Sequence, residues 1–314
     1  MRKTLRILSC AALATLAIGA ARVWRPAHAV EPASQNSAPA DAPTDAQPSA
    51  GESPDNKSAA ATVRVAGIVL KWIRGDKPAN CRRAEPLIRQ AAAGGAQIVC
   101  TTECFLDGYA IADKSIPLDI YRALGEPIPG GPFFRRLAAL ADELNIHLIA
   151  GMLEADGEDR YNTAVVLAPD GKLVGKYRKQ KLQHELVRNT PGNQSRVWKT
   201  PYGKVGVMIC ADRTEPDIVG RFCARGADFL ICPSGGMFGP GKNDPILQAR
   251  SRENGVYIVF VHPAEFLVTT PTGAIETAEL FGDCLLIDLS DEDTDADSRA
   301  VRYFDLPLRS KRGS

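Results

Sequence analysis

The sequence has almost no excess of either charge, because 38 Lys and Arg residues are balanced by 37 Asp and Glu residues in a chain of 314. Proteins that bind nucleic acid through its phosphates usually carry clustered positive charge, so this balance excludes a nucleic-acid partner for the chain as a whole. Aromatic residues are also few, at 6%, while 45% of the residues are hydrophobic. This composition indicates a globular protein rather than a coiled coil or a collagen-like chain.

The motifs of several common enzyme classes are missing. No G-x-G-x-x-G sequence opens a helix, and neither a Walker sequence nor a G-x-S-x-G sequence occurs, which argues against dinucleotide-binding, P-loop and serine-hydrolase sites. Histidine occurs only four times, and no H-x-x-x-H or C-x-x-C pair offers a metal site. We therefore expect neither a metal nor a cofactor.

The first 29 residues are typical of a secretory signal peptide. Basic residues in MRKTLR precede an apolar run, Ile7–Ala21, which at 15 residues is shorter than the roughly 20 that span a bilayer. Ala27, His28 and Ala29 supply a small-residue cleavage site. The sequence therefore predicts cleavage after Ala29 and export to the periplasm or the extracellular space. The alternative is an uncleaved segment that tethers the protein to a membrane.

Residues 30–61 form a linker rich in Pro, Ala and Ser. The stretch has one Val and no aromatic, Ile or Leu residue, so it cannot bury enough apolar surface to offset the entropy of ordering. We expect it to be disordered. The remaining residues, 62–309, have a length that suits one large α/β domain.

Strand and helix patterns alternate through this domain. Apolar or β-branched runs predict strands at 63–69, 96–100, 146–151, 205–210, 229–232, 256–261 and 284–289, and helical spacing predicts helices at 80–93, 132–145, 217–225 and 244–254. The turn sequence Pro169-Asp170-Gly171 between 162–167 and 173–177 predicts an antiparallel hairpin. The fold class is therefore α/β with a mixed sheet, in which ligands bind at the carboxyl ends of strands.

Three chemically active residues follow predicted strands. Cys210 ends the run 205–210, Glu103 comes shortly after 96–100, and Lys179 follows 173–177. Each has a structural interpretation when taken alone: free cysteine is among the most buried residue types, and a lysine beside other basic residues is usually solvated. Together they offer a nucleophile, a base and a cation.

In this order and spacing the three residues resemble the carbon-nitrogen hydrolase (nitrilase) superfamily, and the resemblance extends over most of 63–289. It is carried by GKYRK ending at Lys179, by GKVGVMICAD around Cys210, by YNTAVV at 161–166, by GADFLICPS at 226–234 and by RSRENG at 250–255. The resemblance implies an α-β-β-α sandwich with mixed sheets, a homo-oligomer, and Glu103, Lys179 and Cys210 as catalytic residues. Glu185 looks like the second glutamate of the family. Thr102 and Gln180-Lys181 depart from the usual residues, and a Gly-x-Ser stretch is missing before Pro271.

The resemblance implies hydrolysis of a non-peptide amide or an N-carbamoyl C–N bond through a cysteine thioester. Ala211-Asp212 after the cysteine, in place of the Trp-Glu of true nitrilases, favours the amidase and N-carbamoyl amidohydrolase branches. Ala211, Asp212, Phe105 and Tyr109 are the predicted contacts to a small amide or carbamoyl substrate. Two alternatives remain open: a Cys-His hydrolase that uses His184 or His262, and a catalytically inactive tethered binding domain on the same fold.

Overall fold

The computed structural model describes residues 61–236, 238–281, 288–289 and 299–308. The predicted signal peptide, nearly all of the predicted linker and most of the predicted strand 284–289 lie outside these residues, so those predictions stay predictions. Within the described ranges, no helix is both long enough and apolar enough to cross a membrane.

The first of two large sheets has the strand order β15-β1-β3-β5-β6-β7. Its strands are β15 (Arg299–Pro307), β1 (Thr62–Leu70), β3 (Ile98–Cys100), β5 (His147–Asp156), β6 (Asp159–Leu167) and β7 (Leu173–Arg178), with β4 (Glu126–Pro127) beside β5. Strands β1, β3 and β5 run parallel, while β15, β6 and β7 pair antiparallel with their neighbours. The predicted hairpin and the mixed sheet are confirmed.

The second large sheet has the strand order β13-β12-β11-β10-β9-β8. Its strands are β13 (Ile275–Leu280), β12 (Glu265–Thr269), β11 (Tyr257–His262), β10 (Phe229–Pro233), β9 (Gly203–Val207) and β8 (Val197–Thr200). The central strands β9, β10 and β11 are parallel. A small parallel pair joins β14 (Asp288–Leu289) to β2 (Trp72–Ile73).

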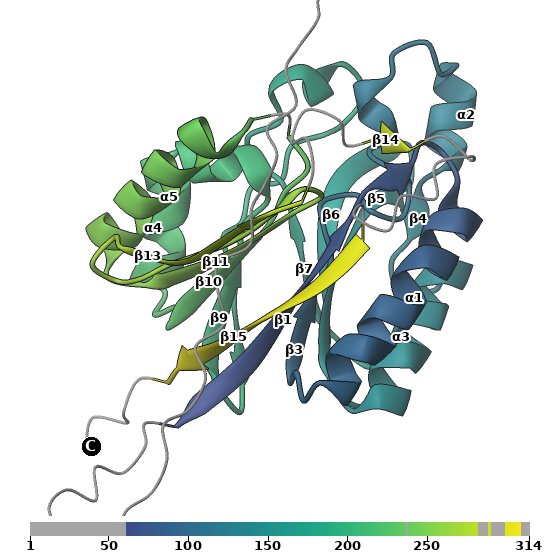
Figure 1. The fold of residues 1–314 in the computed structure, drawn as a ribbon. Coiled ribbons are helices and arrows are strands. Elements are labelled where there is room, and N and C mark those ends of the chain that lie inside the picture. Colours follow the sequence, from purple (N-terminus) through teal and green to yellow (C-terminus); the bar gives the residue numbers. More distant parts are fainter. Residues whose placement is uncertain (1–60, 237, 282–287, 290–298, 309–314) are drawn as a thin grey trace, which may run out of the picture. The chain divides into compact units, whose positions relative to one another are not determined.

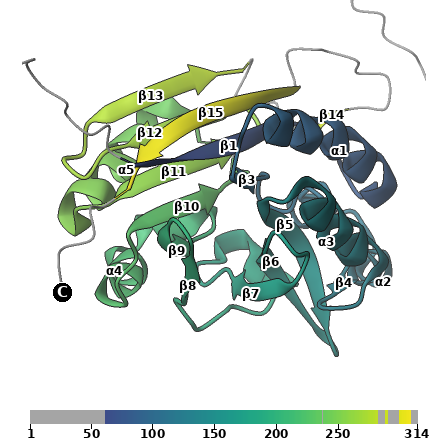
Figure 2. The same ribbon diagram turned by 90° about the horizontal axis from the view of Figure 1, so that it is seen from below.

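Helices cover the outer face of each sheet, which gives the predicted α-β-β-α sandwich (Figures 1 and 2). Helices α1 (Lys77–Ala93) and α3 (Pro132–Leu144) pack on the first sheet, and α4 (Pro216–Ala224) and α5 (Pro240–Asn254) pack on the second. Buried apolar side chains of both sheets, among them Val65, Ile149 and Phe260, form the central core. The remaining helical segments are α2 (Leu118–Ala123) and the 3₁₀ turns η1 (Ala110–Ala112), η2 (Gln183–Val187) and η3 (Cys210–Thr214).

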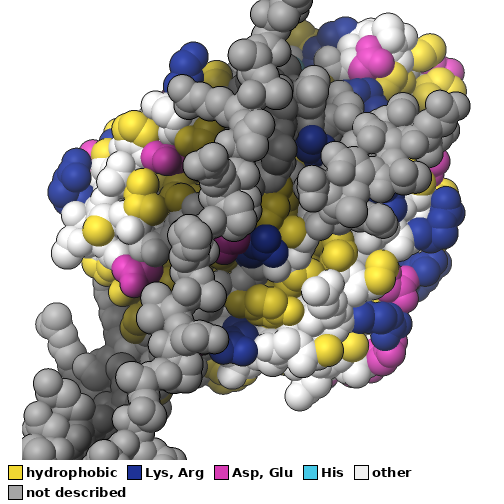
Figure 3. Space-filling view, viewed as in Figure 1, with side chains coloured by type: hydrophobic (Ala, Val, Ile, Leu, Met, Phe, Trp, Pro, Cys, Tyr) yellow, Lys and Arg dark blue, Asp and Glu magenta, His cyan; other side chains and the backbone are white. Residues whose placement is uncertain are grey.

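The outward surface of α1 and α3 carries charges of both signs, which Figure 3 shows intermixed along the side where these helices lie. Arg89 pairs with Glu85 one turn away on α1 and with Glu143 on α3, at 3.0 and 2.5 Å. Arg136 of α3 pairs in turn with Glu85 at 2.6 Å. Exposed pairs of this kind contribute only about 0–1 kcal/mol each, so the buried apolar faces hold the helices in place.

One predicted strand boundary at the site is wrong, and one strand was missed. Strand β9 ends at Val207, so Cys210 begins the turn η3 instead of ending a strand. Met208 and Ile209 are buried and apolar, which made the sequence look like a continuous strand. The strand β15 was not predicted; it pairs with β1 over nine residues and closes the first sheet.

Candidate active site

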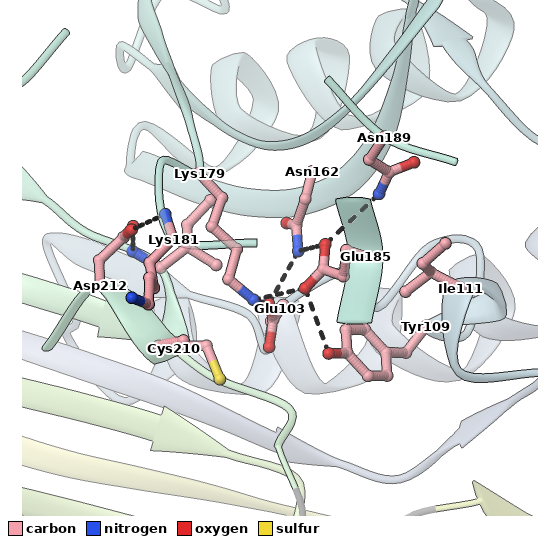
Figure 4. A network of polar contacts seen from close by, with 12 residues as sticks. Glu103, Tyr109, Ile111, Asn162, Lys179, Lys181, Glu185, Asn189, Cys210 and Asp212 are labelled. Atoms are coloured by element: carbon pink, nitrogen blue, oxygen red, sulfur yellow. Dashed lines mark hydrogen bonds and ion pairs between the residues drawn. The ribbon is translucent and has the colours of Figure 1, made fainter. Parts of the chain in front are cut away.

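Glu103, Lys179 and Cys210 meet between the two sheets (Figure 4). Glu103 follows β3, Lys179 follows β7, and Cys210 follows β9. Each of the three is at most 4% exposed. The Lys179 Nζ lies 2.6 Å from the Glu103 Oε1, and Cys210, which is a free thiol, points toward Glu103. The structure therefore brings together the three residues that the sequence singled out.

Lys179 lies between two carboxylates. Its Nζ is 2.6 Å from the Oε1 of Glu103 and 2.5 Å from the Oε1 of Glu185, and all three side chains are buried. Burial alone lowers the pKa of Lys179, but the charges of Glu103 and Glu185 outweigh burial and raise this pKa well above its ordinary value. The ammonium group is therefore charged at all physiological pH values, and one of its three N–H donors remains for a substrate.

Asn162 is a site residue that the sequence analysis did not single out. Its Nδ2 donates to Glu103 at 2.8 Å and to Glu185 at 3.0 Å. Glu185 also accepts from Asn189 Nδ2 at 3.3 Å and from the Tyr109 hydroxyl at 3.3 Å. Tyr109, predicted as a substrate contact, thus lies at the site. A signal for Asn162 was present, since it falls within the YNTAVV block.

The two oxygens of Glu103 have different surroundings. Oε1 accepts from Lys179 and Asn162, whereas Oε2 is buried without a hydrogen-bond partner among the described residues. Oε2 faces Gly235, where an added Cβ would lie 3.1 Å from it, and at the next residue, Gly236, a Cβ would lie 3.2 Å from the Cys210 Sγ. A buried unpaired carboxylate oxygen is costly, and here it lies beside the thiol.

Cys210 adopts a backbone conformation that is uncommon for residues other than glycine, with φ at +47°. Such a conformation costs about 1–3 kcal/mol and persists only where the surrounding structure holds it. Asp212 supplies much of that support. Its carboxylate accepts from the backbone N–H groups of Ile209, Gln180 and Lys181 and from the Tyr177 hydroxyl, at 2.8 to 3.1 Å. These bonds tie the cysteine turn to the segment that follows Lys179.

Two predicted substrate contacts have other positions in the structure. Both oxygens of Asp212 already accept protein hydrogen bonds, and the side chain is fully buried, so its role is to support the turn. Phe105 packs in the apolar cluster between the first sheet and helices α1 and α3, where it is fully buried. Burial in that cluster removes its ring from the site. Ala211 does lie in the turn with Cys210, and its predicted N–H contact to substrate stays a prediction.

Of the two histidines of the alternative Cys-His hydrolase, His262 is not available as a base for Cys210. In His262, Nδ1 accepts from the Ala264 N–H at 3.1 Å and Nε2 lies 2.6 Å from the Gly236 carbonyl oxygen, so both ring nitrogens are occupied. Burial lowers the pKa of His262 to about 4. His184 packs edge-on against Tyr109. The geometry thus favours Glu103 over histidine as the base.

The fold and this arrangement of cysteine, glutamate and lysine define a class of enzyme, the hydrolases that act on C–N bonds of non-peptide amides. The family model described as Carbon-nitrogen hydrolase matches residues 61–289. The chain therefore belongs to the carbon-nitrogen hydrolase family, as its sequence motifs indicated.

Relatives and solved structures agree with this assignment. The chain is 36% identical over 203 residues to an omega-amidase of Xenopus tropicalis, which covers 60% of this chain and 70% of the relative. It is 34% identical over 216 residues to the human omega-amidase, covering 64% and 74%. The structure of Nit3 from Saccharomyces cerevisiae, a nitrilase-superfamily member, has a TM-score of 0.66 at 26% identity and covers 79% of this chain and 90% of its own. An amidase from Nesterenkonia sp. has the same fold, with a TM-score of 0.65 at 20% identity, over 81% of this chain and 94% of its own.

Proposed function

We propose that this hydrolase cleaves a small amide or N-carbamoyl compound through a thioester on Cys210, with Glu103, Lys179 and Cys210 as its catalytic triad. The observation that carries the proposal is the free Oε2 of Glu103, which is buried beside the thiol while Oε1 is held by Lys179 and Asn162. A base must have an oxygen available for the proton that it takes, and this oxygen is fixed in position and shielded from water.

In the first half of the reaction, the thiol proton of Cys210 moves to Glu103 Oε2 and the sulfur attacks the substrate carbonyl carbon. The carbonyl oxygen becomes an oxyanion, which accepts from the remaining N–H of Lys179 and from the backbone N–H of Ala211. One such donor is typically worth about 3–4 kcal/mol of barrier. The C–N bond then breaks, and Glu103 returns its proton to the departing amine or ammonia.

In the second half, water attacks the carbonyl carbon of the thioester. Glu103, again ionised, takes a proton from that water, and the same donors stabilise the second oxyanion. The C–S bond breaks and the proton returns to sulfur, which leaves the free acid and the starting enzyme. Glu185 positions Lys179: its Oε1 forms an ion pair with the Lys179 Nζ at 2.5 Å, which keeps the ammonium group directed at the substrate carbonyl.

The proposed substrate type rests on the similarity of this chain to omega-amidases. An amidase with this fold has also been solved with acrylamide added at its active-site cysteine.

The test is release of ammonia or amine from a panel of amides and N-carbamoyl compounds. Wild-type protein is expected to turn over at least one of them, and Cys210→Ala and Glu103→Gln to lower the rate by at least about 10³-fold. His184→Ala is the matched control and is expected to retain most of the activity. A folded wild-type protein that hydrolyses none of the panel would favour the inactive binding domain.

The proposal also covers where the enzyme is located in the cell and its oligomeric state. Residues 1–29 have the sequence of a secretory signal, so we propose an exported enzyme. Sequencing of the mature N-terminus is expected to find Val30, whereas a start at Met1 would favour the tethered form. We propose a homo-oligomer because superfamily members commonly assemble, and light scattering on the purified enzyme tests this directly.

A further inference from the structure

A second buried cation lies beside the nucleophile. The Nη1 of Arg213 is 3.5 Å from the Sγ of Cys210, and the arginine side chain is only 1% exposed. Among the described residues, Arg213 is the side chain that donates a hydrogen bond to this sulfur. The triad mechanism described above does not use Arg213.

The guanidinium is held in a fixed orientation. Its Nη2 donates to Asn243 Oδ1 at 2.6 Å, and its charge lies 5.6 Å from the ring centre of Phe260 and 5.9 Å from that of Phe238. Asn243 is fixed in turn, because its Nδ2 donates to the Phe238 carbonyl oxygen at 2.6 Å and to Glu265 Oε2 at 3.2 Å. This series of hydrogen bonds, from Glu265 on β12 through Asn243 on α5 to Arg213, therefore directs the second N–H group of the guanidinium at the sulfur.

Charge movement during the reaction explains why a cation is useful at this place. Before proton transfer, the negative charge lies on Glu103, which is hydrogen-bonded to Lys179 and Asn162. After transfer, the charge lies on sulfur. Lys179 interacts with Cys210 electrostatically, but among the described side chains it is Arg213 whose N–H lies within hydrogen-bond distance of that sulfur. A buried thiolate without a nearby cation is strongly disfavoured, and a cation in contact lowers the pKa of a cysteine.

We propose that Arg213 is a further catalytic residue that stabilises the Cys210 thiolate, and that Asn243 and Glu265 are positioning residues that aim it. This inference rests on Cys210 being the nucleophile of the proposed reaction. The planar fork of arginine suits the task because one arm binds Asn243 while the other meets the sulfur. The compact ammonium of lysine does not offer two arms in this geometry.

The test measures the thiolate directly and needs no substrate. The purified full chain is treated with iodoacetamide across a range of pH, and the rate of alkylation at Cys210 is followed by mass spectrometry of the peptide that contains it. Arg213→Gln is expected to raise the midpoint of this pH profile by about one unit or more, which is about a tenfold lower rate below the midpoint. Arg225→Gln, the same change at an exposed arginine of the nearby α4 end, is expected to leave the profile unchanged.

A second variant covers the case in which Arg213→Gln does not fold. Asn243→Ala leaves the guanidinium in place but removes its anchor, so we expect a smaller upward shift of the same midpoint. A folded Arg213→Gln or Asn243→Ala protein with the wild-type alkylation profile would overturn the inference. If the shift occurs in a protein that hydrolyses no amide, Arg213 stabilises the Cys210 thiolate, but the proposed function fails and the catalytic role of Arg213 fails with it.

Discussion

The Nδ2 of Asn162 lies 2.8 Å from the Oε1 of Glu103, inside the protein and close to the lysine that binds the same oxygen. The same nitrogen also reaches Glu185, at 3.0 Å. An amide nitrogen has two N–H donors, so Asn162 can serve one carboxylate with each. It therefore fixes the separation of two negative groups that would otherwise repel one another.

The first prediction concerns this amide. Asn162→Ala is expected to lower kcat by about 10- to 100-fold, because a hydrogen bond to a charged group contributes about 1.5–3 kcal/mol. Asn162→Asp is expected to lower it further, since a third carboxylate would be placed between two others. Steady-state kinetics of amide hydrolysis measure both. Asn193→Ala, at an exposed asparagine, is the control; equal loss in the control and Asn162→Ala would contradict this role.

Two of the three triad positions could be predicted from the sequence because each follows a recognisable strand. The buried run before Glu103 corresponds to β3, and the hairpin strand before Lys179 corresponds to β7; both run in the same direction, so their carboxyl ends lie at one edge of the sheet. The parts that were missed depend on contacts between distant segments. The contact of Arg213 with Cys210 depends on Asn243, 30 residues further along the chain, and no local pattern records that.

The cysteine turn and the last strand show two other limits of sequence reasoning. Hydrophobic periodicity does not distinguish an apolar strand from an apolar turn, and the positive φ of Cys210 has no signature in side-chain type. The sequence of β15 mixes charged and apolar residues, and its pairing with β1 joins segments more than 200 residues apart. Phe105 was misplaced for a related reason: adjacency to Glu103 in sequence did not reveal which side of the sheet its ring would occupy.

The second prediction concerns charge balance around Lys179. Lys179→Met leaves Glu103 and Glu185 buried without their cation, and we expect it to lower the free energy of unfolding by about 3–5 kcal/mol. Adding Glu185→Gln removes one of the two negative charges and is expected to restore part of that stability. Activity is expected to stay lost in both variants, because the oxyanion donor is absent. Urea unfolding and amide hydrolysis measure the two effects separately.

A double variant no more stable than Lys179→Met would show that the two carboxylates do not repel one another in the absence of the lysine. Lys172→Met, at an exposed lysine paired with Asp170, is the control for loss of a surface charge. We expect it to change the free energy of unfolding by less than about 1 kcal/mol.

The third prediction concerns pH and Glu265. Burial raises the pKa of Glu265 to about 7, with a further rise from Asp244 on α5, while Asn243 and Arg213 act in the opposite direction. An acid whose pKa is higher in the folded state binds its proton more tightly there, so stability falls as pH rises from about 4.5 to about 7. Glu265→Gln cannot titrate. We therefore expect the Tm of wild type to fall more between pH 5 and pH 8 than the Tm of Glu265→Gln.

Other buried acids, such as Asp212 with a pKa raised to about 6 by burial, titrate in both proteins. The difference between the two Tm profiles therefore reports Glu265 together with Asp244, the acid that shares a hydrogen bond with it. Glu276→Gln, at an exposed glutamate on β13, is expected to follow the wild-type profile. Parallel profiles for wild type and Glu265→Gln would mean that Glu265 keeps an ordinary pKa in the folded protein.

The last prediction concerns the space beside the thiol. A Cβ at Gly236 would lie 3.2 Å from the Cys210 Sγ, which is tighter than ordinary van der Waals contact, and the sulfur is the atom that must move. Misplacement of a reacting atom by a fraction of an ångström to an ångström costs up to about 100-fold in rate. We expect Gly236→Ala to lower kcat by about 10- to 100-fold while the Tm changes by only a few degrees.

Gly241→Ala provides the matched control. Gly241 lies in helix α5, and a Cβ there meets no atom within 4 Å, so the change is expected to raise the Tm slightly, because alanine is favoured over glycine in helices by about 1 kcal/mol. Its kcat should equal that of wild type. If Gly236→Ala retained full activity, the sulfur would have room to move without cost, and the narrow space between Gly236 and Cys210 would not be what positions the nucleophile.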